Sequence, residues 1–64
     1  MKLTMVTEWN GNICNTSSRL PDNKLRIQSC ISQTQEYCFN LLGTIPTPAE
    51  IMEHMIEFSI DEVG

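Results

Sequence analysis

The dipeptide Asn10-Gly11 constrains the fold of this chain more than any other short segment. Both residue types tolerate positive φ, which the tight turns of β-hairpins require, so the pair predicts a two-residue hairpin turn. Residues 2–9 alternate well enough for a strand before the turn, and residues 12–16 return as a second strand after it. A turn of this length sets the register of the hairpin as Trp9 opposite Asn12, Thr7 opposite Cys14 and Met5 opposite Thr16.

A second turn signal stands at residues 20–23, where Pro suits the first central position and Asp and Asn suit the following ones. Apolar or small residues then alternate with more polar ones over residues 24–31. A period of two is typical of a strand. The sequence therefore predicts a third antiparallel strand here, with Lys24 and Arg26 pointing outward.

The pattern changes to a helical one at residues 32–35, where Ser-Gln-Thr-Gln fits a capping box. Gly43 stands where a left-handed residue should end this short helix of about ten residues. The clearest local signal in the chain is Thr-Pro-Ala-Glu at residues 47–50, with Thr as the cap, Pro at the first helical position and Glu near the positive end of the dipole. A last helix is expected from there, with no helix breaker before Gly64.

These elements predict an α+β fold, in which a small three-stranded antiparallel sheet of two hairpins is followed by two helices packed on one of its faces. The 64 residues are expected to make a single domain, with a β-meander over residues 1–31 and a two-helix segment over residues 32–64. A domain of this size buries only about 60% of the surface of its unfolded chain. It is therefore too small to enclose a deep pocket, and no small-molecule substrate is expected.

Cysteine usage and hydropathy indicate the compartment. The chain has three cysteines, Cys14, Cys30 and Cys38. This odd number and the lack of a signal-peptide apolar region favour free thiols in a reducing compartment, so we expect a cytoplasmic protein. No apolar run approaches the ~18 residues of a membrane span, so no membrane association is expected.

Charge is divided unequally along the chain. Residues 1–32 carry four cationic and two acidic side chains, a net charge of +2, whereas residues 33–64 carry six acidic side chains and no Lys or Arg, a net charge of −6. In a last helix continuing from residue 47, spacings of three and four would put four of these acids on one face: Glu50, Glu53, Glu57 and Asp61. Acids four apart repel by roughly 0.2–0.5 kcal/mol per pair, so this stripe works against its own helix.

The carboxylate stripe has three interpretations. It is a solvated face of an acidic protein, or a docking surface for a basic partner protein, or a surface neutralised by Arg19, Lys24 or Arg26 of the same chain. The apolar face of the same predicted helix includes Met52 and Met55, whose flexible side chains suit either a core or a surface that pairs with a partner or with a second copy.

Metal binding and catalysis are less well supported. A zinc site of three cysteines and His54 would lack the close ligand pair that such sites carry, so neither a metal nor a cofactor is expected. His54 is expected to pack with one ring nitrogen satisfied. A Cys38–His54 dyad has no third, orienting group, and Glu53 with Glu57 lacks the cleft that would shift a pKa. We therefore expect no enzyme activity.

Nucleic-acid binding has a minimal basis in the basic residues of the predicted sheet. Lys2, Arg19, Lys24 and Arg26 with Trp9 nearby would be enough for a weak single-strand platform. Four cationic side chains against eight carboxylates make a poor match for a polyanion, so direct binding is not favoured.

The sequence thus predicts a small acidic interaction protein, a regulator or inhibitor that binds and occludes another macromolecule through the carboxylate face of its C-terminal helix. A nucleic-acid-handling protein would be one such target, and size and class favour an accessory role of the kind found on phages and mobile elements. The alternatives are an obligate dimer joined through Met52 and Met55, and a weak single-strand binder.

Overall fold

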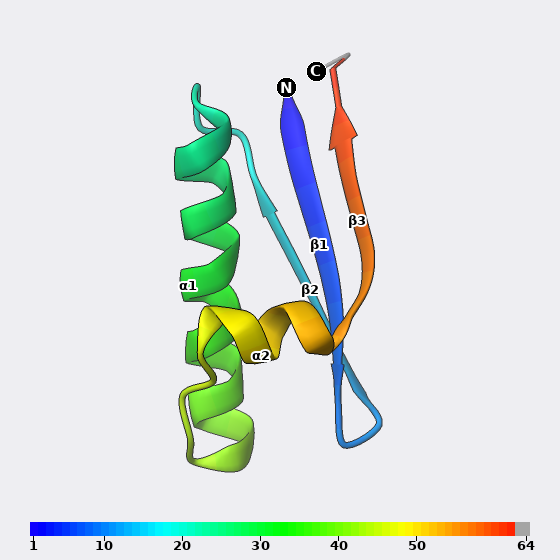
Figure 1. The fold of residues 1–64 in the computed structure, drawn as a ribbon, viewed down its shortest axis with the longest axis vertical. Helices are drawn as coiled ribbons and strands as arrows, with labels where there is room; N and C mark the ends of the chain where they lie inside the picture. Colours follow the sequence, from blue (N-terminus) through cyan, green and yellow to red (C-terminus); the bar gives the residue numbers. More distant parts are fainter. Residues whose placement is uncertain (63–64) are drawn as a thin grey trace.

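The chain forms a three-stranded antiparallel sheet and two helices, as shown by a computed structural model that describes residues 1–62 (Figure 1). The elements in chain order are β1 (Lys2–Trp9), β2 (Asn12–Ser18), α1 (Asn23–Leu42), α2 (Pro48–Glu53) and β3 (Met55–Asp61). The strand order across the sheet is β2-β1-β3. The predicted α+β class and the three antiparallel strands are confirmed, whereas the predicted order of three strands followed by two helices is wrong.

The β1–β2 hairpin forms as predicted. Asn10 and Gly11 both have positive φ, 50° and 82°, as the two-residue turn requires. The strands pair antiparallel with the three contacts expected from the sequence: Trp9 opposite Asn12, Thr7 opposite Cys14 and Met5 opposite Thr16.

The third strand predicted over residues 24–31 is wrong, because this segment is the first half of α1. Asp22 caps the helix, and its side chain accepts a hydrogen bond of 2.7 Å from the backbone amide of Lys24. The capping box predicted at residues 32–35 is also wrong, since these residues lie inside the helix. There the hydroxyl of Thr34 donates to the carbonyl of Cys30, one turn earlier, at 2.8 Å.

Helix α1 ends and α2 begins where the sequence predicts. Gly43 adopts φ 77° and donates its amide to the carbonyl of Phe39, which closes α1. The hydroxyl of Thr47 accepts from the amide of Glu50 at 3.2 Å, with Pro48 at the first helical position.

The predicted continuation of the last helix is wrong. Helix α2 ends at Glu53, and β3 begins at Met55 after one intervening residue, His54. Strand β3 pairs antiparallel with β1, with a β-bulge at Val6 and Thr7. The predicted division into a meander over residues 1–31 and two helices after it therefore does not describe the chain. The helix breaker Gly64 lies outside the described residues.

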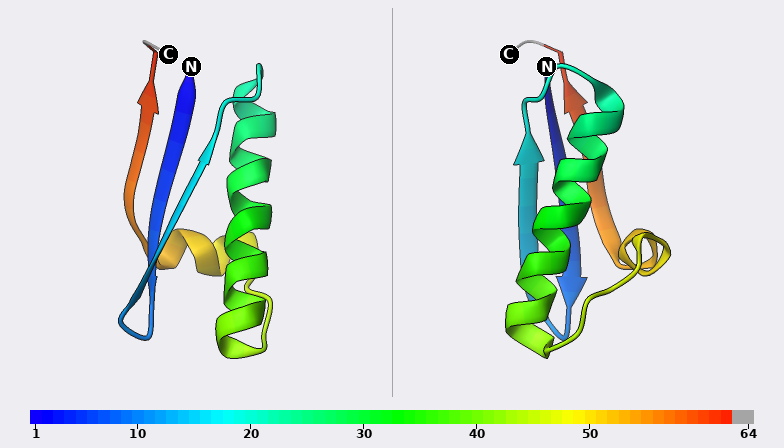
Figure 2. Two further views of the ribbon diagram at one scale, coloured as in Figure 1. Left: turned by 180° about the vertical axis from the view of Figure 1, so that it is seen from behind. Right: turned by 90° about the vertical axis from the view of Figure 1, so that its left-hand side faces the viewer.

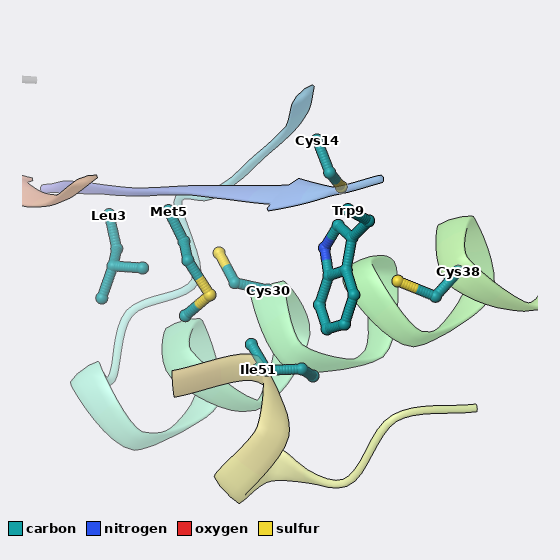
Figure 3. Close-up of a cluster of buried hydrophobic side chains, with 7 residues drawn as sticks. All are labelled: Leu3, Met5, Trp9, Cys14, Cys30, Cys38 and Ile51. Carbon is teal, nitrogen blue, oxygen red and sulfur yellow. The ribbon is translucent and has the colours of Figure 1, made fainter. Parts of the chain in front are cut away.

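Helix α1 packs against β2 and β1 and lies over one face of the sheet (Figure 2). Four α1 residues spaced four apart are buried there: Arg26, Cys30, Thr34 and Cys38. Mostly small side chains let the helix lie close to the strands, and the larger core residues fill the remaining space. The core cluster is Leu3, Met5, Trp9, Cys14, Cys30, Cys38 and Ile51 (Figure 3).

Strand β3 is buried much less than its neighbour β1. On the face that carries the core, Ile60 lies opposite Leu3, and Phe58 lies opposite Met5. Leu3 and Met5 are 0% and 2% exposed, whereas Ile60 and Phe58 are 41% and 44% exposed. The core-side face of the sheet is therefore covered over β2 and β1 and left largely open over β3.

Candidate functional site

An apolar groove lies where β3 is uncovered. Its volume is about 490 Å³, and no polar side chain lines it. It is lined by residues of the sheet and of both helices: Met5, Ile27, Ile31, Pro48, Ile51, Met52, Met55 and Phe58. Such a groove can bind apolar side chains, but it contains no group that could act as an acid, a base or a nucleophile.

The β-bulge turns two residues of β3 into the groove. Thr7 lies opposite Met55 and Val6 lies opposite Glu57, so Ile56 is the extra residue between them. In a regular strand Met55 and Phe58 would face opposite sides of the sheet. With the extra residue inserted, both line the groove.

Helix α2 forms one wall of the groove, and Ile51 holds it there. Ile51 is 1% exposed and belongs to the core cluster, so it ties the short helix to the sheet and to α1. Its neighbour Met52 is 71% exposed although it also lines the groove. The wall therefore has a fixed inner part and an adaptable outer rim.

His54 fixes the corner between α2 and β3. Its ring stacks on the ring of Trp9, with centroids 4.1 Å apart and planes inclined by 13°. Its Nδ1 lies 2.9 Å from the carbonyl oxygen of Glu8, which can only accept, so Nδ1 carries the donated proton. The amide of Glu8 in turn donates to the carbonyl of His54 at 3.1 Å. The expected packing role of His54, with one nitrogen satisfied, is confirmed.

The predicted carboxylate stripe is not a single face of a helix. Glu50 and Glu53 lie on α2, whereas Glu57 and Asp61 lie on β3. In β3 these two acids occupy the face opposite the core, where Glu57 pairs with Val6, and Asp61 pairs with Lys2. The spacing of four between Glu53 and Glu57 therefore does not place them on one helix face, because the helix ends between them.

Among the predicted partner-binding residues, Met52 and Met55 lie together in the groove. The structure therefore groups the two methionines and separates the four acids. All four acids are exposed, so each remains accessible from solvent.

The cationic residues do not lie where the predicted sheet put them. Lys24 and Arg26 belong to α1, and Arg26 is 2% exposed instead of pointing outward. Its guanidinium donates to the carbonyl of Leu20 and to the side-chain oxygen of Asn23. Trp9 is buried against the helix as well. Arg26 and Trp9 are therefore not available to an exposed platform of the kind predicted for single-strand binding.

The three cysteines are buried and free. Burial raises the pKa of the Cys14 thiol above its ordinary value of 9.0, and hydrogen bonding to Thr7 and Thr34 only partly opposes this. Burial also raises the pKa of the Cys38 thiol, with smaller contributions from Cys14 and Glu50. Among residues 1–62 no group of three or more His, Cys, Asp or Glu side chains is placed to hold a metal ion.

Several groove residues lie outside the surfaces that the sequence assigned to binding. Ile27 and Ile31 line the groove from α1, four residues apart. That spacing is the helical signal that the period-two interpretation of residues 24–31 concealed. Phe58 lies within the segment predicted as the last helix and reaches the groove from a strand instead.

Fold and groove together define a small two-layer α+β protein with a partly uncovered sheet and no membrane-spanning helix in its described part. Comparison of the chain with protein-family models, with curated proteins and with solved structures gave no match.

Proposed function

We propose that this chain is a non-catalytic interaction protein, a small regulator or inhibitor that binds a segment of another protein in the apolar groove. The observation that carries the proposal is the open core-side face of β3. Phe58 and Ile60 occupy core-facing positions of the sheet and remain 44% and 41% exposed beside the groove. Exposed apolar surface gathered in a concave site is typical of a binding site.

Burial of the exposed apolar side chains at this site would supply part of the binding energy. Burying a large apolar side chain completely is worth about 1.5–3 kcal/mol. Phe58, Ile60 and Met52 are 44%, 41% and 71% exposed. Completing their burial would contribute on the order of 3 kcal/mol, before any backbone or ionic contact is counted.

The chemistry of the groove supports binding rather than catalysis. All eight lining residues are apolar, and none can transfer a proton or attack a substrate. The groove also replaces the predicted carboxylate face as the proposed contact surface, because Glu53 and Glu57 belong to different elements.

The compartment and the biological setting remain parts of the proposal. Free, buried thiols suit a reducing compartment such as the cytoplasm. An accessory or antagonist role of the kind found on phages and mobile elements stays a prediction from size and class.

Site-specific photo-crosslinking tests the proposal. A photoreactive phenylalanine analogue is placed at Phe58, beside the groove, and separately at Phe39, which is 55% exposed on α1 and does not line it. In the native host, irradiation should join the Phe58 variant to a discrete protein and leave the Phe39 variant unmodified. Equal products from both positions, or none from Phe58, would contradict the proposal.

Homodimer formation is a second candidate, favoured by one observation. Met52 lines the groove and is 71% exposed, so the groove could be covered by a second copy of the chain. In that case the Phe58 crosslink would be a dimer of the chain itself. Sedimentation would then show a dimer that dissociates on dilution, and Met52→Glu would give a monomer.

A further inference from the structure

We infer that the occupant of this site is an extended segment that adds to the free edge of β3 as a fourth strand, with apolar residues alternating with Lys or Arg. This inference rests on the proposed function and specifies the partner chemistry of the same site. It combines three features of β3: its free edge, its exposed core-side positions and its acidic outer face.

The first feature is the free edge. Strand β3 is the last strand in the order β2-β1-β3, so within residues 1–62 its outer edge pairs with no other strand. Proteins commonly block such edges with Pro or Lys. The seven residues of β3, MIEFSID, contain neither, and no Arg. Apart from the bulge at its start, this edge can accept another strand.

The second feature is the incomplete layer above β3. The other edge strand, β2, has its core-side residues Cys14, Thr16 and Ser18 buried beneath α1. In β3 the equivalent residues Phe58 and Ile60 are exposed. A strand added beside β3 would place every second side chain next to these two residues. Those side chains must therefore be apolar.

The third feature is charge on the opposite face of the sheet. Glu57 is exposed on that face. Because it belongs to the edge strand, its side chain would be the direct neighbour of a side chain of the added strand. Residues 33–62, which include the second half of α1 as well as α2 and β3, contain six acidic side chains and no Lys or Arg. Opposite charges on neighbouring strands stabilise pairing, so the outward positions of the segment should be Lys or Arg.

The same charge argues against a second copy of β3 as the occupant. A symmetric antiparallel pair centred on Glu57 puts that residue opposite itself. A pair centred on Ser59 puts Glu57 opposite Asp61 of the second copy, and one centred on Phe58 brings the two Glu57 side chains onto a diagonal. Like charges in these positions are destabilising. Like charges therefore disfavour pairing of β3 with a second copy of itself, whereas a basic strand can pair with this edge.

Peptide binding to the isotope-labelled whole chain tests the inference. The probe is a short, capped peptide of alternating Lys and Val. One control has Glu in place of Lys, and another has the same composition in an amphipathic helical order. The Lys-Val peptide should slow exchange of edge-facing β3 amide protons by at least about tenfold and shift the Phe58 and Met52 side-chain signals.

Two substitutions separate the charge from the groove. Glu57→Lys should weaken binding of the Lys-Val peptide by about tenfold, since it turns an attractive cross-strand pair into a repulsive one. Glu57→Gln should give a smaller loss. Glu36→Lys, a matched change at an exposed position of α1 that does not line the groove, should leave binding within about twofold. Circular dichroism confirms that each variant is folded.

Each outcome decides the inference. If the Glu peptide binds as well as the Lys peptide, or if the helical order binds without protecting β3, the partner chemistry is wrong while groove binding stands. If no peptide perturbs β3, the inference fails, and the crosslink at Phe58 decides separately whether the groove binds a protein at all.

Discussion

Replacing Ile51 by Ala tests whether α2 and the groove wall depend on one buried side chain. Ile51 is the only residue of α2 that is buried, at 1% exposed, and it is part of the core cluster. The substitution removes three carbon groups. At about 0.8 kcal/mol for each buried group, the transfer term alone is about 2.4 kcal/mol.

The cavity contribution should be modest at this site. Ile51 borders the open groove, so the space left by its side chain joins that groove instead of forming a closed void. The total should therefore stay near the lower end of the range for such substitutions, about 2.5–3 kcal/mol. A domain of this length has roughly 3–10 kcal/mol of total stability, so the loss would be a large share.

Urea unfolding measures this loss. The free energy of unfolding is followed by circular dichroism and by the fluorescence of Trp9, which is the single tryptophan and is buried. Met52→Ala, at the adjacent but 71% exposed position, is the control and should cost less than about 0.5 kcal/mol. A loss below about 1 kcal/mol for Ile51→Ala, or equal losses for both variants, would refute the assigned role of Ile51.

Three further predictions concern the helix ends and the thiols. Gly43→Ala should lower the free energy of unfolding by about 1 kcal/mol, measured in urea, and Gly43→Asn should lower it less. The reason is backbone strain, because φ is 77° and no atom lies within 4 Å of an added Cβ. Equal losses for the two variants would contradict this backbone origin. Asp22→Ala should cost about 1 kcal/mol through loss of the α1 cap, and Asp22→Ser should restore most of it. The raised thiol pKa values mean that the folded state holds these protons to higher pH than the unfolded chain. Stability from this source is therefore fully present below the ordinary pKa of 9.0 and falls as pH rises above it. Urea titrations across that window should show the fall, and a Cys14→Ala/Cys38→Ala variant should show less of it; an unchanged pH dependence would exclude the thiols as its cause.

Local turn and cap signals could be predicted because they depend on a few adjacent residues. Asn10 and Gly11 supply the positive φ of the hairpin, Gly43 ends α1, and Thr47 caps α2. At each of these positions the backbone needs a particular conformation or hydrogen bond, and the residue type found there can supply it. None of these signals depends on what packs nearby.

Helix α1 could not be predicted from hydrophobic periodicity because its buried stripe is not strongly hydrophobic. The stripe consists of Arg26, Cys30, Thr34 and Cys38. Meanwhile Leu25, which completes the apparent alternation with Ile27, is 51% exposed. This segment is helical because its small side chains pack closely against the sheet. That contact involves residues outside the segment, so the segment's own pattern does not predict it.

Strand β3 was mistaken for helix because its bulge reproduces a helical spacing. Met52, Met55 and Phe58 are three residues apart, as on one face of a helix. The inserted residue Ile56 gives Met55 and Phe58 the same side in a strand. The groove was therefore partly visible in the sequence as a methionine-rich face, but its construction from the sheet and both helices was not.

The central position of β1 has a consequence for how the chain is made. Its partner β2 follows after a two-residue turn, but its other partner β3 is the last element among residues 1–62. During synthesis from the N-terminus, the hairpin and α1 therefore emerge while one edge of β1 is still bare. Closing the sheet requires the longest-range contact in the fold, which is formed late and at the highest entropic cost. Until then the bare edge of β1 can accept β3 from its own chain or from a neighbouring copy.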